Sequence, residues 1–366
     1  MGSDSNCSCR EQFESDHMSG PVRDWGQSRI ASGGAQFVSD PNPCDSIGSG
    51  YDHTVDLIRF PDDARPEHWH EPVLALGNFD GLHRGHMKIV ERVCRTAAEH
   101  GRTPVVVTFD PHPTRVLRPE QAPPLIMTLE QKVEILEQAG VQGVAIVRFT
   151  PEMSHWEPET FVSRVLVDWL RVSEVWVGSN FVFGRGRSGT FAVLQALGDR
   201  FMFRADKIDP VCVKDVAVSS TRIRRFLGEG RVDEAAALLG RHAFIDGEVV
   251  PGDERGRLLG FPTANLRTVN ELLPPHGVYA TVARIGTEFF PAVTNLGVKP
   301  TFGGEGVATI EAHLLRGGRD LYGQRLRLYF VARLRDERKF DSVDALKAQI
   351  DRDCREVEVL FDRISV

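Results

Sequence analysis

The sequence predicts an α/β domain followed by a small antiparallel β-barrel with a C-terminal helix. Its 366 residues suggest two domains, because a typical domain has roughly 150. From about Val73, short apolar runs alternate with helical patterns, as in a parallel sheet covered by helices. After about Arg241, strand-like segments cluster between Gly/Pro turns, which is typical of a barrel. We expect the two domains at residues 53–240 and 241–366.

Four apolar runs predict parallel strands in the first domain, because strands buried on both faces read as continuous apolar segments. They are Val73–Leu76, Val105–Phe109, Val144–Phe149 and Val175–Gly178. A helix follows the first run, with apolar residues at helical steps as far as Ala97 and Gly101 as its C-terminal cap. Thr128 and Gln131 predict a capping box for a helix that Gly140 ends. A last helix is expected over Val232–Leu239.

Five strand-like segments predict the second domain: Phe244–Val250, Gly277–Ile285, Phe289–Asn295, Ala308–Leu315 and Arg325–Leu334. Leu326, Leu328 and Phe330 alternate with polar residues, as in a strand buried on one face. From about Ser342, apolar residues recur at three- and four-residue steps as far as Leu360, which predicts the final helix.

Residues 1–52 differ from the rest of the chain. They are rich in Gly and Ser, carry more acidic than basic residues and show no apolar periodicity. Such a segment buries too little apolar surface to offset the entropy lost on ordering. We therefore expect a disordered tail.

The composition argues against several classes of protein. With 44 basic and 51 acidic residues, a protein held to nucleic acid by a basic surface is not expected. No apolar run approaches the roughly 18 residues of a membrane span, and the start lacks the basic and apolar regions of a secretory signal. The six cysteines form no CxxC pair, which disfavours a zinc ribbon or a disulfide framework. A cytoplasmic protein with reduced thiols is expected.

The sharpest motif directly follows the first apolar run, where residues 77–86 read GNFDGLHRGH and open a helix. Backbone N–H groups at a helix start bind anions, and glycines allow tight turns and the close approach of a phosphate. His83 and His86 share one face of the first turn, where two imidazoles can hold phosphate oxygens in a transition state. The alternatives are a zinc site, for which no third ligand is marked, and a plain helix cap.

Three further segments follow in the order TFDPHP, GSNFVFGRGRSG and VSSTRIR, at residues 108–113, 178–189 and 218–224. Asp110 and His112 fit a capped turn between prolines better than an acid–base pair. Phe181 and Phe183 can stack on a flat ring system or fill the core. The third segment offers hydroxyls and arginines as a second anion cradle, or as a helix cap beside solvated arginines.

Together these four segments resemble the flavin adenylyltransferase module of the HxGH nucleotidylyltransferases. The resemblance implies a Rossmann-like domain that transfers AMP from ATP to FMN, with His83 and His86 as catalytic residues. It implies an ATP site made of Gly77, Phe79, Asp80, Gly81, Gly85, Asn180, Ser219, Ser220, Thr221, Arg222 and Arg224. It also implies flavin contacts by Phe109, Pro111, Pro113 and Phe183.

A second dense region, residues 247–265, reads GEVVPGDERGRLLGFPTAN. Its Gly-rich loop with arginines can wrap a polyphosphate, although taken alone it fits a mobile hairpin equally well. Thr263 and Asn265 supply neutral oxygens that suit Mg²⁺, because this ion takes few protein ligands besides phosphates. The alternative is a hydrogen-bonded turn after Pro262.

This region resembles the signature of riboflavin kinases, as do NLGVKPTF, TIEAHL and LYG at residues 295–302, 309–314 and 321–323. The resemblance makes Glu311 the general base that takes the proton of a primary hydroxyl. Without the motif, Glu311 reads as an outward strand residue beside an inward Ile310. The implied ATP contacts are Gly252, Gly256, Arg257, Gly260 and Pro262, and the implied metal ligands are Thr263 and Asn265.

Over residues 73–362 the chain resembles the bifunctional prokaryotic-type riboflavin kinases/FAD synthetases. The implied function is Mg²⁺-dependent phosphorylation of riboflavin to FMN by ATP, followed by adenylylation of FMN to FAD with release of pyrophosphate. Riboflavin, FMN and ATP are the expected partners, without nucleic acid or membrane, and the oligomeric state stays open. Two alternatives are a nucleotidylyltransferase for another phosphate ester and a non-catalytic flavin-binding regulator.

Overall fold

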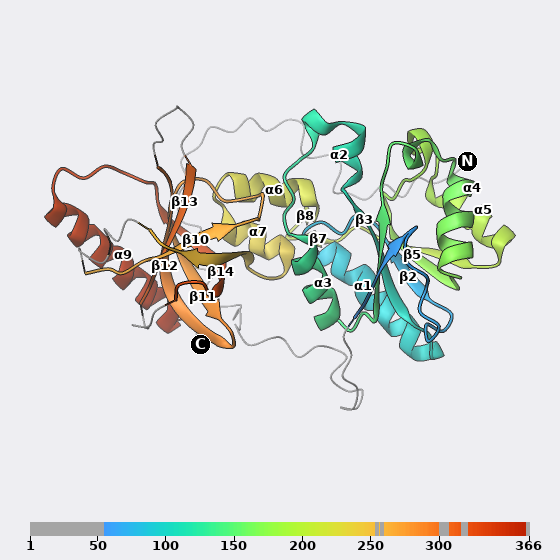
Figure 1. Ribbon diagram of the computed structural model, residues 1–366, viewed down its shortest axis with the longest axis horizontal. Helices are drawn as coiled ribbons and strands as arrows, with labels where there is room; N and C mark the ends of the chain where they lie inside the picture. Colours follow the sequence, from blue (N-terminus) through green and yellow to red (C-terminus); the bar gives the residue numbers. More distant parts are fainter. Residues whose placement is uncertain (1–54, 253–255, 257–259, 300–306, 316–320, 364–366) are drawn as a thin grey trace.

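The computed structural model describes residues 55–252, 256, 260–299, 307–315 and 321–363. The predicted tail at residues 1–52 and the predicted ATP-binding residue Arg257 lie outside these ranges. Within the ranges, no helix combines the length and apolar character needed to cross a bilayer. Figure 1 shows two bodies, a helix-covered sheet and a barrel, with α6 and α7 between them.

The first body is a six-stranded parallel sheet in the order β1-β4-β3-β2-β5-β6. Its strands are β1 (Asp56–Phe60), β2 (Val73–Leu76), β3 (Pro104–Asp110), β4 (Gly143–Arg148), β5 (Glu174–Gly178) and β6 (Arg204–Ile208). Apolar clusters cover both faces, so β2 is buried along its whole length. The strand order reverses between β2 and β5, and ligands of such sheets bind at the carboxyl ends of strands beside this point.

The helices of this body follow the predicted pattern. They are α1 (Arg84–His100), α2 (Pro113–Leu117), α3 (Leu129–Gln138), α4 (Pro158–Phe161) with its π-helical continuation η3 (Val162–Trp169), α5 (Phe191–Phe201), α6 (Ser220–Gly228) and α7 (Val232–Leu239). Gly101 ends α1 with a left-handed φ of 63°, which confirms the predicted cap. Thr128 and Gln131 make both bonds of the predicted capping box, at 2.9 and 3.2 Å.

The edge strands β1 and β6 are the parts of this sheet that the apolar runs do not predict. Both carry charged residues, among them Arg59 in β1 and Asp206 in β6. An edge strand is covered less completely than a central one, so charge is tolerated there and the apolar signal is weak.

The second body is a closed antiparallel barrel in the order β10-β13-β12-β11-β14-β9. Its strands are β9 (Ala243–Val250), β10 (Ala264–Thr268), β11 (Gly277–Ile285), β12 (Glu288–Lys299), β13 (Val307–Leu314) and β14 (Arg325–Arg335). The final helix α9 (Val343–Arg363) packs Val357 and Phe361 on the outside of the barrel. Its buried Asp353 accepts a hydrogen bond of 2.7 Å from Arg335, which fixes the helix to β14. The predicted barrel with a C-terminal helix is confirmed.

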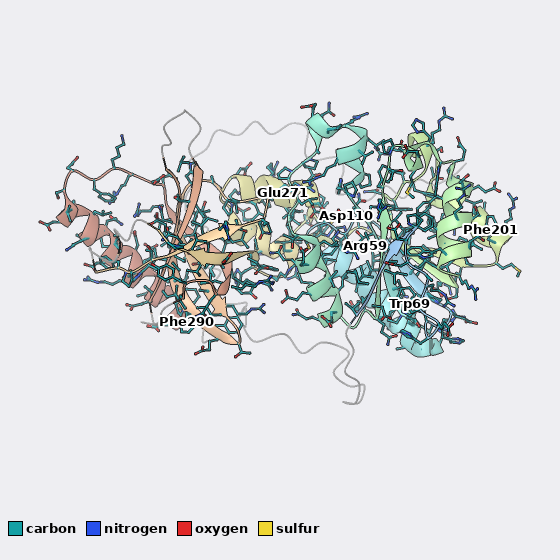
Figure 2. The ribbon with its side chains drawn as sticks, viewed as in Figure 1. Arg59, Trp69, Asp110, Phe201, Glu271 and Phe290 are labelled. Atoms are coloured by element: carbon teal, nitrogen blue, oxygen red, sulfur yellow. The ribbon has the colours of Figure 1, made fainter. Side chains whose placement is uncertain are left out.

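The two bodies meet through an apolar core and a polar rim. The apolar core runs from α6 and α7 into the barrel and includes Leu239 and Leu328. On the rim, Glu134 of α3 accepts hydrogen bonds from Arg327 and Arg284 of the barrel. Figure 2 shows Asp110 and Glu271 near this boundary, whereas Phe201 lies on the far side of the first body and Phe290 at the lower end of the barrel.

Candidate active sites

The loop between β2 and α1 holds an unusual backbone shape. Phe79, Gly81 and Leu82 all have positive φ, at 48°, 86° and 39°, a region that non-glycine residues rarely adopt. A Cβ at Gly81 would lie 2.9 Å from Ile126 Cδ1, so glycine also provides room there. The side chains of Phe79 and Leu82 are buried. A ligand at this loop therefore meets mainly its backbone.

The predicted histidine pair begins α1. His83 is the N-cap, and its Nδ1 accepts a hydrogen bond of 3.2 Å from the backbone N–H of His86. The two imidazole rings stack with centroids 3.6 Å apart. A Cβ at Gly85 would lie 3.3 Å from the His83 ring, so Gly85 leaves room for that imidazole. Because Nδ1 is an acceptor, neutral His83 carries its proton on Nε2, from which it can donate.

Both imidazoles are neutral at physiological pH. Burial lowers the pKa of His83 from 6.5 to about 4, and the charge of Arg241 acts in the same direction. Burial also lowers the pKa of His86, helped by His83, Lys132 and Arg241. The pair therefore offers N–H donors without a net charge of its own.

This titration predicts a pH-dependent stability. In the unfolded chain His83 takes up a proton near 6.5, but in the fold it does so only near 4, so its contribution to stability is lost as pH falls through this window. The expected loss is about 2 kcal/mol at pH 5. His83→Asn keeps a capping side chain but does not titrate, so urea unfolding of both proteins at pH 7.5 and 5 measures the effect. The same pH dependence in both proteins would contradict the burial argument.

The predicted second anion cradle lies directly beside this loop. Ser220 Oγ donates to the backbone oxygen of Asp80 at 2.9 Å. The Asp80 carboxylate accepts hydrogen bonds from Ile126 N–H, at 3.1 Å, and from the Arg224 guanidinium. Asp80 and Arg224 thus brace the loop against α6 from inside the protein.

The start of α6 is a capped helix terminus, as the second of the two interpretations of this segment predicted. Ser219 accepts a hydrogen bond of 3.3 Å from the backbone N–H of Arg222. The Arg222 guanidinium donates to the carbonyl of Ala217. Thr221 is exposed. The two predicted phosphate-binding segments are therefore brought together, with several of their side chains engaged in protein contacts.

The predicted flavin residues follow the ends of strands that flank β2. Phe109 lies at the end of β3 and Pro111 directly follows that strand, whereas the exposed Asn180, a predicted ATP residue, lies just after β5. Phe183 is 8% exposed, and its ring packs 5.8 Å from that of Phe161 in the core. Phe183 therefore fills the core, which is one of the two roles that the sequence left open for it.

The loop that carries Pro111 and Pro113 is a capped turn. His112 Nδ1 accepts a hydrogen bond of 3.2 Å from the backbone N–H of Thr114. The prediction that this segment is a capped turn between prolines is confirmed. Pro113 is the first residue of α2.

Lys132 is a residue of this site that the motifs do not mark. Its Nζ donates to the backbone oxygen of Asn78 at 2.9 Å and to Thr108 Oγ1 at 3.1 Å. Burial lowers its pKa to about 8, whereas Asp80 and Asp110 act in the opposite direction. The position of Lys132 in the sequence could have revealed it. Lys132 falls on the apolar helix face of Leu129 and Leu136, where a lysine needs buried partners.

In the barrel, Glu311 lies between two asparagines. The β13 residue Glu311 pairs directly with Asn265 of β10 and with Asn295 of β12. Side chains opposite each other in a sheet share one face, so the three form a row across three strands. Ile310 is buried and Glu311 half-buried. The expected alternation of inward and outward side chains therefore holds, and it places the Glu311 carboxylate in this polar row.

The predicted metal ligands are packed against glycines of the preceding loop. A Cβ at Gly252 would lie 2.0 Å from Asn265 Nδ2, and a Cβ at Gly256 would lie 3.2 Å from Thr263 Oγ1. Only glycine lets the loop backbone approach this closely. Gly252 and Gly256 therefore form one unit with the Thr263–Asn265 pair.

Two other predicted ATP residues border this unit. Gly260 has a φ of 91° and is exposed, while the carbonyl of Pro262 accepts a hydrogen bond of 2.8 Å from His313 Nδ1. Across the ranges that the structure covers, no three His, Cys, Asp or Glu side chains gather to hold a metal ion.

A cavity of about 320 Å³ continues the polar row. Gly297 and Thr309 line it, and these residues pair with each other two positions along the strands from the pair of Asn295 and Glu311. The other lining residues are Glu271, Leu272, Leu273, Pro274, Pro275, His276 and Leu296. The cavity thus lies two residues along β13 from Glu311, which does not itself line it.

The comparisons with known proteins assign both bodies. The model of the FAD synthetase family matches residues 65–222, and the riboflavin kinase family matches residues 239–361. The bifunctional riboflavin kinase/FMN adenylyltransferase of Escherichia coli is 38% identical over 282 residues, covering 77% of this chain and 90% of its own. The Pseudomonas fluorescens enzyme of that name is 38% identical over 299 residues, covering 82% and 96%.

A solved structure supports the arrangement of both bodies. A protein of Streptococcus pneumoniae, described as a macrolide-efflux protein, superposes with a TM-score of 0.75 at 27% identity. The match covers 83% of this chain and 99% of the other.

The fold and sites define a two-domain transferase, with a Rossmann-like nucleotidylyltransferase domain joined to a β-barrel kinase domain. The chain belongs to the bifunctional riboflavin kinase/FMN adenylyltransferase family.

Proposed function

We propose that the barrel phosphorylates riboflavin to FMN and that the α/β domain adenylylates FMN to FAD, each with its own ATP. The observation that carries this proposal is the presence of two separate polar sites, one on each body, each within the match of its own family model. The proposed domain boundaries remain residues 53–240 and 241–366. The cytoplasmic location also remains as predicted from composition.

In the kinase step, Glu311 acts as the general base. Its carboxylate takes the proton of the riboflavin 5′-hydroxyl while that oxygen attacks the γ-phosphorus of ATP and ADP leaves. The flanking Asn265 and Asn295 support this role, because their amides can orient the hydroxyl and the phosphate. The proposed ATP contacts in this domain are Gly252, Gly256, Arg257, Gly260 and Pro262.

Thr263 and Asn265 are the proposed ligands of Mg²⁺ in this domain. Their neutral oxygens beside a close glycine backbone fit an ion that keeps most of its coordination for phosphate oxygens and water. When bound, Mg²⁺ offsets the negative charge of the phosphates.

In the adenylylation step, a phosphate oxygen of FMN attacks the α-phosphorus of ATP, and pyrophosphate leaves. His83 and His86 donate N–H groups to the oxygens on which charge gathers at that phosphorus. The loop between β2 and α1 positions the triphosphate, mainly through its backbone. The loop residues that we assign to this role are Gly77, Phe79, Asp80, Gly81 and Gly85.

The remaining predicted residues complete the adenylylation site. We assign Asn180, Ser219, Ser220, Thr221, Arg222 and Arg224 to ATP and the leaving pyrophosphate. We assign Phe109, Pro111 and Pro113 to the flavin, with the core residue Phe183 behind them.

Incubation of the purified full-length chain with riboflavin, ATP and Mg²⁺ tests both steps. We expect chromatography to show FMN first and FAD later, with both products absent when EDTA removes the metal. A parallel reaction started from FMN isolates the second step. Recovery of unchanged riboflavin would contradict the kinase assignment, and recovery of unchanged FMN the adenylyltransferase assignment.

A further inference from the structure

Arg241 connects the two bodies at the adenylylation site. It lies in the short link between α7, which ends at Leu239, and β9, which begins at Ala243. Its Nη2 donates to the carbonyl of Gly81 at 2.6 Å, and its Nη1 donates to the carbonyl of Leu82 at 2.8 Å. The residue at the start of the barrel half thus holds the phosphate loop 160 positions earlier in the chain.

These two bonds set the direction of two peptide groups. In a trans peptide the C=O and the following N–H point in opposite directions. Arg241 draws the carbonyls of Gly81 and Leu82 to one side, so the N–H groups of Leu82 and His83 point to the other. Both carbonyls belong to residues with positive φ, a conformation that needs support from its surroundings.

The charge of Arg241 also reaches the histidine pair. Burial and the nearby Arg327 lower its pKa to about 10, so the guanidinium remains a cation at neutral pH. It is one of the charges that lower the pKa of both His83 and His86. One side chain therefore orients the loop and favours neutral imidazoles.

We propose that Arg241 is a positioning residue for adenylyl transfer, which turns the N–H groups of Leu82 and His83 toward the phosphates of ATP. The inference rests on the adenylylation proposed above. It implies that the α/β site is completed by a residue from the link to the barrel.

The experiment measures both activities of the full-length chain in Arg241→Met and Arg241→Lys. We expect Arg241→Met to lower kcat/KM for adenylylation about 10²-fold, the size of effect that a misplaced reacting group produces. The loss should lie in kcat and in KM for ATP, with KM for FMN within about 2-fold, because the flavin residues are on other loops. Arg241→Lys keeps a cationic donor and should retain more adenylylation activity than Arg241→Met.

Arg284→Met is the matched control. Arg284 also crosses the boundary, with 3.1 Å between its Nη2 and Glu134 Oε1, but it does not contact the loop. We expect this variant to keep both activities, and Arg241→Met to keep FMN formation, which also shows that it is folded.

Three results would overturn the inference: full adenylylation activity in Arg241→Met, an equal loss of both activities in that variant, or the same loss in Arg284→Met. Failure of the wild-type chain to convert FMN to FAD would instead overturn the proposed function.

Discussion

Replacing His83 and His86 together by alanine abolishes FAD formation and leaves FMN formation intact. The two imidazoles are stacked 3.6 Å apart at the start of α1, where their N–H groups can meet the α-phosphate. Loss of donors to a developing charge should lower kcat for adenylylation at least about 10³-fold. The measurement is FAD formation from FMN and ATP, with FMN formation from riboflavin followed in the same preparation.

His100→Ala is the control for this pair. His100 lies at the other end of the same helix, where its Nδ1 contacts the backbone oxygen of Thr96. We expect both activities to remain in this variant. Loss of FMN formation in the double histidine variant would show that the two sites are not independent, and near-normal FAD formation would remove the pair from catalysis.

The fold was predictable where a local signal coincides with its tertiary role. Val73–Leu76 reads as a buried strand because helices cover both of its faces, and Thr128 forms its capping box within four residues. The edge strands β1 and β6 give no comparable signal, since charged residues are tolerated at the side of a sheet. The strand β10 was not predicted, because its first residues, Ala264 and Asn265, belong to the motif at residues 247–265.

The site residues could be predicted where they lie within a continuous sequence motif. The sequence placed His83 and His86 on one helical turn, but their lowered pKa values depend on burial that only the packed fold provides. Arg241 carries no motif, because its role arises from contact with a loop 160 residues away. The row of Asn265, Glu311 and Asn295 likewise depends on the register of three strands. Long-range contacts of this kind leave no periodicity in a single sequence.

Glu311→Gln removes riboflavin phosphorylation and leaves adenylylation of added FMN intact. Glutamine keeps the size of the side chain and its position in the row between Asn265 and Asn295, but it cannot take a proton. General-base catalysis contributes roughly 10²- to 10⁴-fold, so we expect kcat for FMN formation to fall about 10³-fold, with little change in KM for ATP. The rate of ADP release with riboflavin as acceptor measures this.

The strand β9 offers a control that distinguishes loss of the base from loss of any carboxylate of the barrel. Glu248 of β9 is exposed, and its Oε2 lies 2.6 Å from Arg267 Nη2, so Glu248→Gln should leave both activities unchanged. If Glu311→Gln phosphorylates riboflavin at the wild-type rate, the carboxylate does not take the proton. The row would then serve only to bind the hydroxyl and the phosphate through its amide groups. A fall in FMN formation with adenylylation unchanged instead assigns the proton transfer to Glu311 and confines it to the barrel.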